Sequence, residues 1–195
     1  MVKFKRNSKR WAKNMWYQII MKDIGSWVYL INIFLVIFAR FLDMISTYYV
    51  SKELQLETNK LARKLGWKGM ILIQIPVIIL GSLDFYFALF IFCWSLLLFG
   101  NNIQGSWYIK KIGEDSYQKE LSSHLESVKS WKIIISELSY LLTFSFTGLM
   151  ILLSIFVFND KIAVFFISLA FICQGIIGTV RTIRYLFELK KEKKQ

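Results

Sequence analysis

Long apolar runs separated by polar segments are the main pattern along this chain. Four runs, near residues 27–50, 70–99, 131–158 and 161–187, are apolar over most of their length. A helix needs roughly 20 residues to cross the hydrocarbon core of a bilayer, and each run is longer than that. The pattern therefore predicts an all-α, polytopic membrane protein, in which a bundle of four transmembrane helices occupies residues 27–187.

The polar segments predict shorter elements at the two membrane surfaces. Residues 1–26 mix Lys and Arg with Trp and Tyr, which indicates an amphipathic helix at the inner interface. Segment 52–68 predicts a short helix on the outer surface, with Gly66 placed to end it. Segment 116–132 predicts an amphipathic helix on the inner surface, and residues 188–195 form a basic tail.

Composition and charge support a membrane location and predict an orientation. The chain is 55% hydrophobic, has one proline and carries a formal net charge of +12. With four spans and both termini inside, eighteen Lys and Arg residues fall on the inner side and six on the outer side. The positive-inside rule therefore favours cytoplasmic termini, with the bilayer and anionic lipid head groups as partners. Because no recognition motif accompanies the basic residues, the charge does not indicate nucleic-acid binding.

Charged residues inside the apolar runs are the candidate functional groups. They are Arg40, Asp43, Asp84 and Glu137. A charge at the centre of a bilayer costs about 2.5–3.5 kcal/mol on insertion scales, so each needs a partner, a proton or water. Arg40 and Asp43 are three residues apart and Thr47 follows four residues later, so all three share one helix face. This polar stripe is expected to face another helix and not lipid.

The balance of these charges predicts an ion or proton site. Asp84 is expected at the middle of the second span, on a face with the small residues Gly81, Ala88 and Ser95 that meets the stripe. Arg40 is the counter-charge but does not neutralise two carboxylates. The predicted site residues are Asp43, Thr47, Glu57, Asn59 and Asp84. For a hard cation such as Na⁺, Ca²⁺ or Mg²⁺, the metal ligands would be Asp43, Glu57 and Asp84. The alternative is a structural network that pins the helices together.

Part of this pattern resembles a family of small uncharacterised prokaryotic membrane proteins. The matching residues are Asp43-x-x-Ser46-Thr47, Glu57-x-Asn59, Leu61-Ala62-Arg63 and Gly66. In that family a first span with Asp-x-x-[Ser/Thr]-Thr is followed by Glu-x-Asn-Pro, and Lys60 stands here where the family has proline. The resemblance covers residues 38–80. It implies a common role for Asp43, Thr47, Glu57 and Asn59, but no activity. The expected location is a prokaryotic plasma membrane.

Function is predicted to be non-enzymatic. The chain has no His-Glu-x-x-His, Gly-x-Ser-x-Gly, P-loop or Gly-x-Gly-x-x-Gly motif, and its one histidine, His124, lies in a polar loop. We expect a small transporter, a channel-like unit or a subunit that binds or conducts a cation or proton. The alternatives are an accessory subunit for assembly and an intramembrane enzyme acting on lipid or peptide. Four spans are few for a transporter, which favours a homo-oligomer or a larger complex.

The fourth apolar run predicts two further contacts. Gly175, Gly178 and Thr179 form a small-residue face, expected to pack on the side of the third run marked by Tyr140, Thr143 and Thr147, or on a second copy. Arg181 and Arg184 follow near the inner interface, where their side chains are expected to contact lipid head groups.

Overall fold

The computed structural model describes residues 27–192, and within this range the fold is helical with no strand. The elements are α2 (Trp27–Val50), α3 (Lys60–Gly81), α4 (Phe85–Ile103), α5 (Ser106–Ile112), α6 (Glu114–Ser127), α7 (Ser130–Leu153), the 3-10 turn η1 (Ser154–Phe156) and α8 (Lys161–Glu192). The all-α prediction is confirmed. The amphipathic helix expected within residues 1–26 lies outside the described residues.

Five of these helices, rather than the four predicted, are long and apolar enough to cross a membrane. They are α2, α3, α4, α7 (continued by η1) and α8. The chain is thus an integral membrane protein by the length and composition of its helices. The count of four is not confirmed, because residues 70–99 do not form one helix. They belong to α3 and α4, which a turn at residues 82–84 separates.

Asp84 explains why the helix is interrupted there. Its backbone is extended, with φ −142° and ψ 142°, and its carboxylate accepts hydrogen bonds from the backbone N–H groups of Tyr86 and Phe87. These are free donors at the start of a helix, and an aspartate side chain satisfies them well. Asp84 therefore begins α4 instead of lying in the middle of a span.

Gly66 divides α3 near its start. Its φ of +63° is non-helical and favours glycine, so the helix bends between a first segment, residues 60–65, and a second, residues 67–81. The predicted stop at Gly66 is confirmed, but the helix expected over 52–68 begins only at Lys60. At the other end of the chain, the expected tail from residue 188 is helical as far as Glu192, the last turn of α8.

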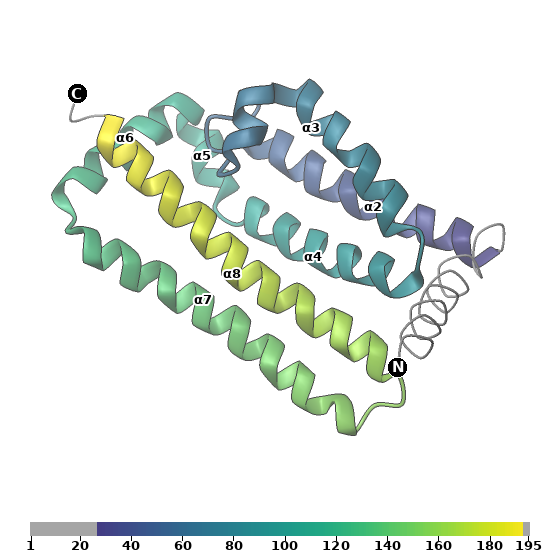
Figure 1. The fold of residues 1–195 in the computed structure, drawn as a ribbon. Helices are drawn as coiled ribbons and strands as arrows, with labels where there is room; N and C mark the ends of the chain where they lie inside the picture. Colours follow the sequence, from purple (N-terminus) through teal and green to yellow (C-terminus); the bar gives the residue numbers. More distant parts are fainter. Residues whose placement is uncertain (1–26, 193–195) are drawn as a thin grey trace, which may run out of the picture.

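The five long helices lie in a row, as Figure 1 shows. The order across the row is α7, α8, α4, α2 and α3. The outer pairs α7–α8 and α2–α3 are antiparallel, whereas α8, α4 and α2 run parallel to one another. The packing is closest between α7 and α8, α8 and α4, and α4 and α2, whereas α3 packs more lightly. The short helices α5 and α6 lie where α4 and α8 finish. The two ends of the helix axes are called the two ends of the row. The start of α2 at residue 27 and the end of α8 at residue 192 lie at opposite ends of the helix axes.

Close packing of α7 against α8 depends on small residues, as predicted. Gly175 lies against Phe144 and Ser145 of α7, and Gly178 lies against Tyr140. The hydroxyl of Thr179 donates to the backbone carbonyl of Glu137 at 3.3 Å. The predicted face of α8 is therefore confirmed, with α7 as its partner. The predicted contacts of Thr143 and Thr147 are not seen: both side chains are exposed and donate to carbonyls of their own helix.

Apolar side chains cover the outside of the row, and polar ones fill much of its interior. Phe34, Leu72 and Leu142 are each more than 60% exposed, as lipid-facing residues of a membrane helix are. The buried polar residues of the five long helices are Asn32, Asp43, Ser46, Thr47, Gln74, Ser95, Ser168, Gln174 and Thr179. Polar groups in a bilayer need internal hydrogen-bond partners, so these side chains decide how the helices fit together.

Candidate functional site

Arg40 is the centre of the polar network. It lies about 20 Å from the start of α2 and about 15 Å from its end. One guanidinium nitrogen pairs with Asp43 Oδ2 at 2.8 Å. Nε donates to Gln74 Oε1 at 2.6 Å and Nη1 donates to Ser95 Oγ at 3.2 Å. Arg40 thus joins α2, α3 and α4 through a carboxylate, an amide and a hydroxyl. The predicted contact between the Arg40 face and the small-residue face of α4 is confirmed at Ser95.

A second contact between α2 and α4 lies about two turns further along, at Asn102. Asp43 is 8% exposed, and its backbone carbonyl accepts the hydroxyl hydrogens of Ser46 and Thr47. The Asn102 amide donates to both hydroxyl oxygens at 3.0 Å. Thr47, a predicted ligand, is therefore hydrogen-bonded within the protein.

The loop after α2 is organised by Glu114, at the start of α6. Its carboxylate accepts hydrogen bonds from the hydroxyl of Ser51 and from the backbone N–H groups of Glu53, Gln55 and Leu56. Such charge-assisted bonds to a carboxylate are stronger than neutral ones. Glu114 therefore fixes the loop that brings Glu57 towards α2.

Glu57 and Asn59 lie just beyond this part of the loop. The backbone N–H of Asn59 donates to Glu57 Oε1 at 2.8 Å, and the Asn59 side chain accepts from Leu61 N at 3.1 Å, which caps α3. Burial raises the pKa of the Glu57 carboxyl above its ordinary value, and the negative charge of Asp43 raises it further, while the Asn59 hydrogen bond opposes both effects. Glu57 and Asp43 therefore act on each other electrostatically.

Arg181 of α8 faces this pair of carboxylates. It lies close enough to Asp43 and Glu57 to interact electrostatically with both. Its neighbour on the next turn, Arg184, is exposed and lines a cleft at the end of α8. The two arginines predicted to contact lipid thus have different surroundings, and only Arg184 is fully at the surface.

Asp84 does not belong to this group. Arg40 bonds to Ser95, which lies eleven residues beyond Asp84 on the same helix, an axial separation of roughly 16 Å. The expectation that Asp84 and Asp43 share one site is therefore wrong, because Asp84 caps the start of α4. Among the described residues, no three His, Cys, Asp or Glu side chains are grouped so that they could hold a metal ion.

Three polar residues important to the network were not identified from the sequence: Gln74, Asn102 and Glu114. The signal for the first two is an amide within a long apolar run, where its donors need partners. Gln174 of α8, on the side of α4 away from α2, is another amide in a long apolar run that has hydrogen-bond partners on other helices. Its side chain accepts from Trp94 Nε1 at 2.7 Å and donates to the Tyr140 hydroxyl at 2.9 Å, so it joins α8 to both α4 and α7.

Comparisons with known proteins add no family to these observations. The chain matched no protein-family model, no curated protein and no solved structure. The resemblance of residues 38–80 remains a sequence-based hypothesis. Function is therefore argued from the site.

Proposed function

We propose that this integral membrane protein binds and conducts protons through the acidic pair Asp43 and Glu57, as a small transporter or channel-like subunit. The observation that carries the proposal is the arrangement of charge around the pair. Arg40 is paired with Asp43 alone, at 2.8 Å, and its other bonds go to neutral groups. In the described part of the chain Glu57 forms no ion pair and lies partly buried beside a second carboxylate, with Arg181 and Arg63 acting on it only through longer-range electrostatics. A proton on either acid relieves the repulsion between the two carboxylates.

Buried polar side chains connect Asp43 with the loop that carries Glu57. From Asp43, polar side chains continue through Thr47 and Ser51 towards Glu57, at the end of the row that holds α5 and α6. In the opposite direction Val36 and Ala39 have no exposed surface. In this proposal protons reach Asp43 from the end that bears Glu57, along these polar side chains.

Proton flux in reconstituted liposomes tests the proposal. Wild-type protein should dissipate an imposed pH gradient when a potassium ionophore compensates charge. Asp43→Asn and Glu57→Gln should each lower that flux by roughly tenfold or more, because each removes a proton-carrying group while keeping the shape of the side chain. The readout is a pH-sensitive dye trapped inside the vesicles.

Asp84→Asn is the matched control. It makes the same chemical change at a carboxylate that caps a helix, and asparagine caps helices as well as aspartate does. Its flux should stay within about twofold of wild type, since Asp84 lies outside the acidic pair. Wild-type flux no greater than that of empty liposomes, or an equal loss in all three variants, would refute proton conduction by this pair.

An accessory role in assembly is the second candidate function, favoured by the bonds of Arg40. A guanidinium that joins three helices is the kind of contact that fixes helix packing in a membrane. In that case the acidic pair would be structural, and the protein would act by presenting its helices to a partner or to a second copy. The rescue experiment described in the Discussion separates the two candidates.

We also propose that the end of the row bearing α5, α6 and the last turns of α8 faces the cytoplasm of a prokaryotic plasma membrane. Of the sixteen Lys and Arg residues in the range 27–192, fourteen belong to segments at this end, the exceptions being Arg40 and Lys161. The positive-inside rule places such an end in the cytoplasm. If all five long helices cross the membrane, the start of α2 then faces the outside, in contrast to the expected pair of cytoplasmic termini.

A further inference from the structure

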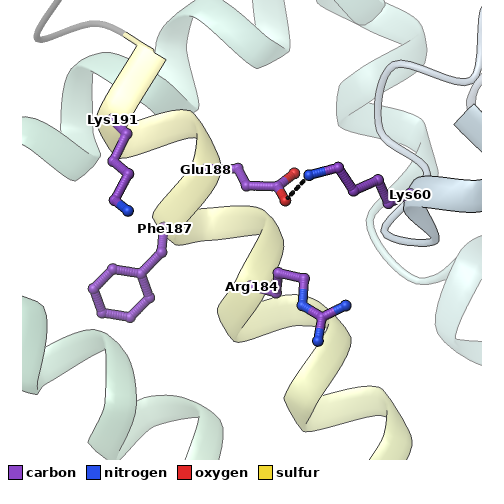
Figure 2. Close-up of a pocket in the computed structure, with 5 residues that line it drawn as sticks. All are labelled: Lys60, Arg184, Phe187, Glu188 and Lys191. Carbon is purple, nitrogen blue, oxygen red and sulfur yellow. Dashed lines mark hydrogen bonds and ion pairs between the residues drawn. The ribbon is translucent and has the colours of Figure 1, made fainter. Parts of the chain in front are cut away.

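A basic cleft, whose lining does not include Asp43 or Glu57, lies at the end of α8. It is lined by Lys60, Arg184, Phe187, Glu188 and Lys191, and its volume is about 380 Å³. Figure 2 shows Arg184 and Glu188 of α8 directed towards Lys60 of α3, with Phe187 and Lys191 directed to the other side of the helix. The cleft therefore combines three cationic side chains, one carboxylate and one aromatic ring.

The one carboxylate of the cleft is already neutralised. Glu188 Oε1 pairs with Lys60 Nζ at 2.9 Å, and its other oxygen pairs with Arg63 at 2.7 Å. Within residues 27–192, Arg184 and Lys191 form no ion pair. Two exposed cations are thus left beside a carboxylate that has no further capacity to balance them.

The spacing of these two cations suits a phosphate group. Arg184 and Lys191 are seven residues apart, which is two turns or roughly 10 Å along the helix, and both line the cleft. Their side chains point to different sides of α8 in Figure 2, so binding one anion between them requires these long side chains to turn towards each other. A guanidinium binds phosphate through two parallel hydrogen bonds and an ammonium binds it as a point charge. Phe187 lies between them in sequence and supplies an apolar surface against which an acyl chain can pack.

We propose that this cleft binds the phosphate-bearing head group of an anionic membrane lipid. The cleft lies near the end of a membrane helix, where lipid head groups are at high local concentration, and a free phosphate compound would gain nothing from the aromatic ring. Basic clefts between transmembrane helices recognise anionic lipid heads in this way. This site is separate from the acidic pair, and its occupation is measured without any proton flux.

Thermal unfolding of the full chain in dodecyl maltoside, with added lipid, tests the proposal. Phosphatidylglycerol should raise the unfolding midpoint and phosphatidylcholine should not, because only a ligand of the folded state shifts it. The double variant Arg184→Gln/Lys191→Gln should weaken the apparent affinity for phosphatidylglycerol by roughly tenfold or more, since both phosphate partners are lost. Phe187→Ala should weaken lipid binding while leaving the fold intact.

The control is Lys111→Gln/Lys119→Gln, which removes the same charge from exposed positions of α5 and α6 at the same end of the molecule. Its affinity for phosphatidylglycerol should change by less than about twofold. An equal loss in this control would show diffuse attraction and refute the cleft. Stabilisation by glycerol 3-phosphate equal to that by phosphatidylglycerol would show a soluble phosphate ligand and refute a lipid. A flat response to phosphatidylglycerol would refute the site.

Discussion

At the scale of single residues, Arg40 makes the contacts that hold the polar interior of α2, α3 and α4 together. It contributes hydrogen bonds to Gln74 and Ser95 and an ion pair to Asp43, and it lies far from either end of α2. Burying a charge is costly unless it is paired and hydrogen-bonded. With these three partners the guanidinium is retained within the membrane, and the partners in turn fix where α3 and α4 lie against α2.

Removing Arg40 alone should be strongly destabilising. Arg40→Met leaves the Asp43 carboxylate buried without its counter-charge, which should lower the free energy of unfolding by about 3–5 kcal/mol. The double variant Arg40→Met/Asp43→Asn should recover more than half of this loss, because no uncompensated charge remains. Reversible unfolding in mixed micelles, followed by tryptophan fluorescence, measures both.

The same double variant separates the two candidate functions. If Asp43 carries protons, stability returns but proton flux does not. If the network is only structural, the double variant should form the same oligomers or complexes as the wild type. As a check on partner identity, Arg40→Met/Asp84→Asn should show no recovery, since Asp84 caps α4 and does not contact Arg40. A recovery there as large as that with Asp43→Asn would contradict the ion pair described here.

At the scale of helices, the α7–α8 hairpin shows how small residues set the distance between two axes. A Cβ added at Gly148 would lie 2.7 Å from Ile172 Cγ1 and 2.9 Å from the backbone oxygen of Ser168. The Ser168 hydroxyl also donates to the Gly148 carbonyl at 2.6 Å, which holds the two backbones close. The backbone oxygen of Ser168 cannot move away from the added Cβ without separating the helices.

Gly148→Ala should therefore destabilise the protein although alanine is the better helix former. We expect a loss of about 1–3 kcal/mol in the free energy of unfolding, from the clash with α8. Gly100→Ala is the control, because nothing lies within 4 Å of the added Cβ at that position in α4. It should be neutral or stabilising by up to about 1 kcal/mol. Similar effects at the two glycines would show that packing at Gly148 is loose.

At the scale of the whole molecule, charge is distributed very unevenly between the two ends of the row. The loop 51–59, α5, α6 and the end of α8 form one end, and the turns at 82–84 and 154–160 form the other. Nearly all basic residues of the described range belong to the first end. This asymmetry is the basis of the proposed orientation. In that orientation the basic cleft would face the cytoplasmic leaflet, where anionic lipids attract basic side chains.

Single-cysteine labelling tests the orientation. In a Cys93→Ser/Cys173→Ser background, Asn159→Cys should react with a membrane-impermeant maleimide on intact cells, because the turn between α7 and α8 faces outward. His124→Cys, at a side chain on α6 that is 75% exposed, should react only after the cells are permeabilised. The reverse pattern would invert the topology.

The sequence alone determined the class of this protein and several local features. Long apolar runs require helices in a bilayer, because only a helix satisfies the backbone within a single segment. The stop at Gly66, the shared face of Arg40 and Asp43 and the small face of α8 follow from local rules about φ angles and helical spacing. Because those rules depend only on nearby residues, the structure confirms the three features.

Only the tertiary structure decided which distant residues meet. Hydropathy does not distinguish one long helix from two helices joined by a turn of only three residues, so it predicts Asp84 in the middle of a span although Asp84 caps α4. The partners of Arg40 lie 34 and 55 residues away on other helices. Glu114 reaches back 63 residues to hold the loop that carries Glu57. Such contacts depend on how helices pack, because that packing and not the local sequence brings the side chains within hydrogen-bonding distance.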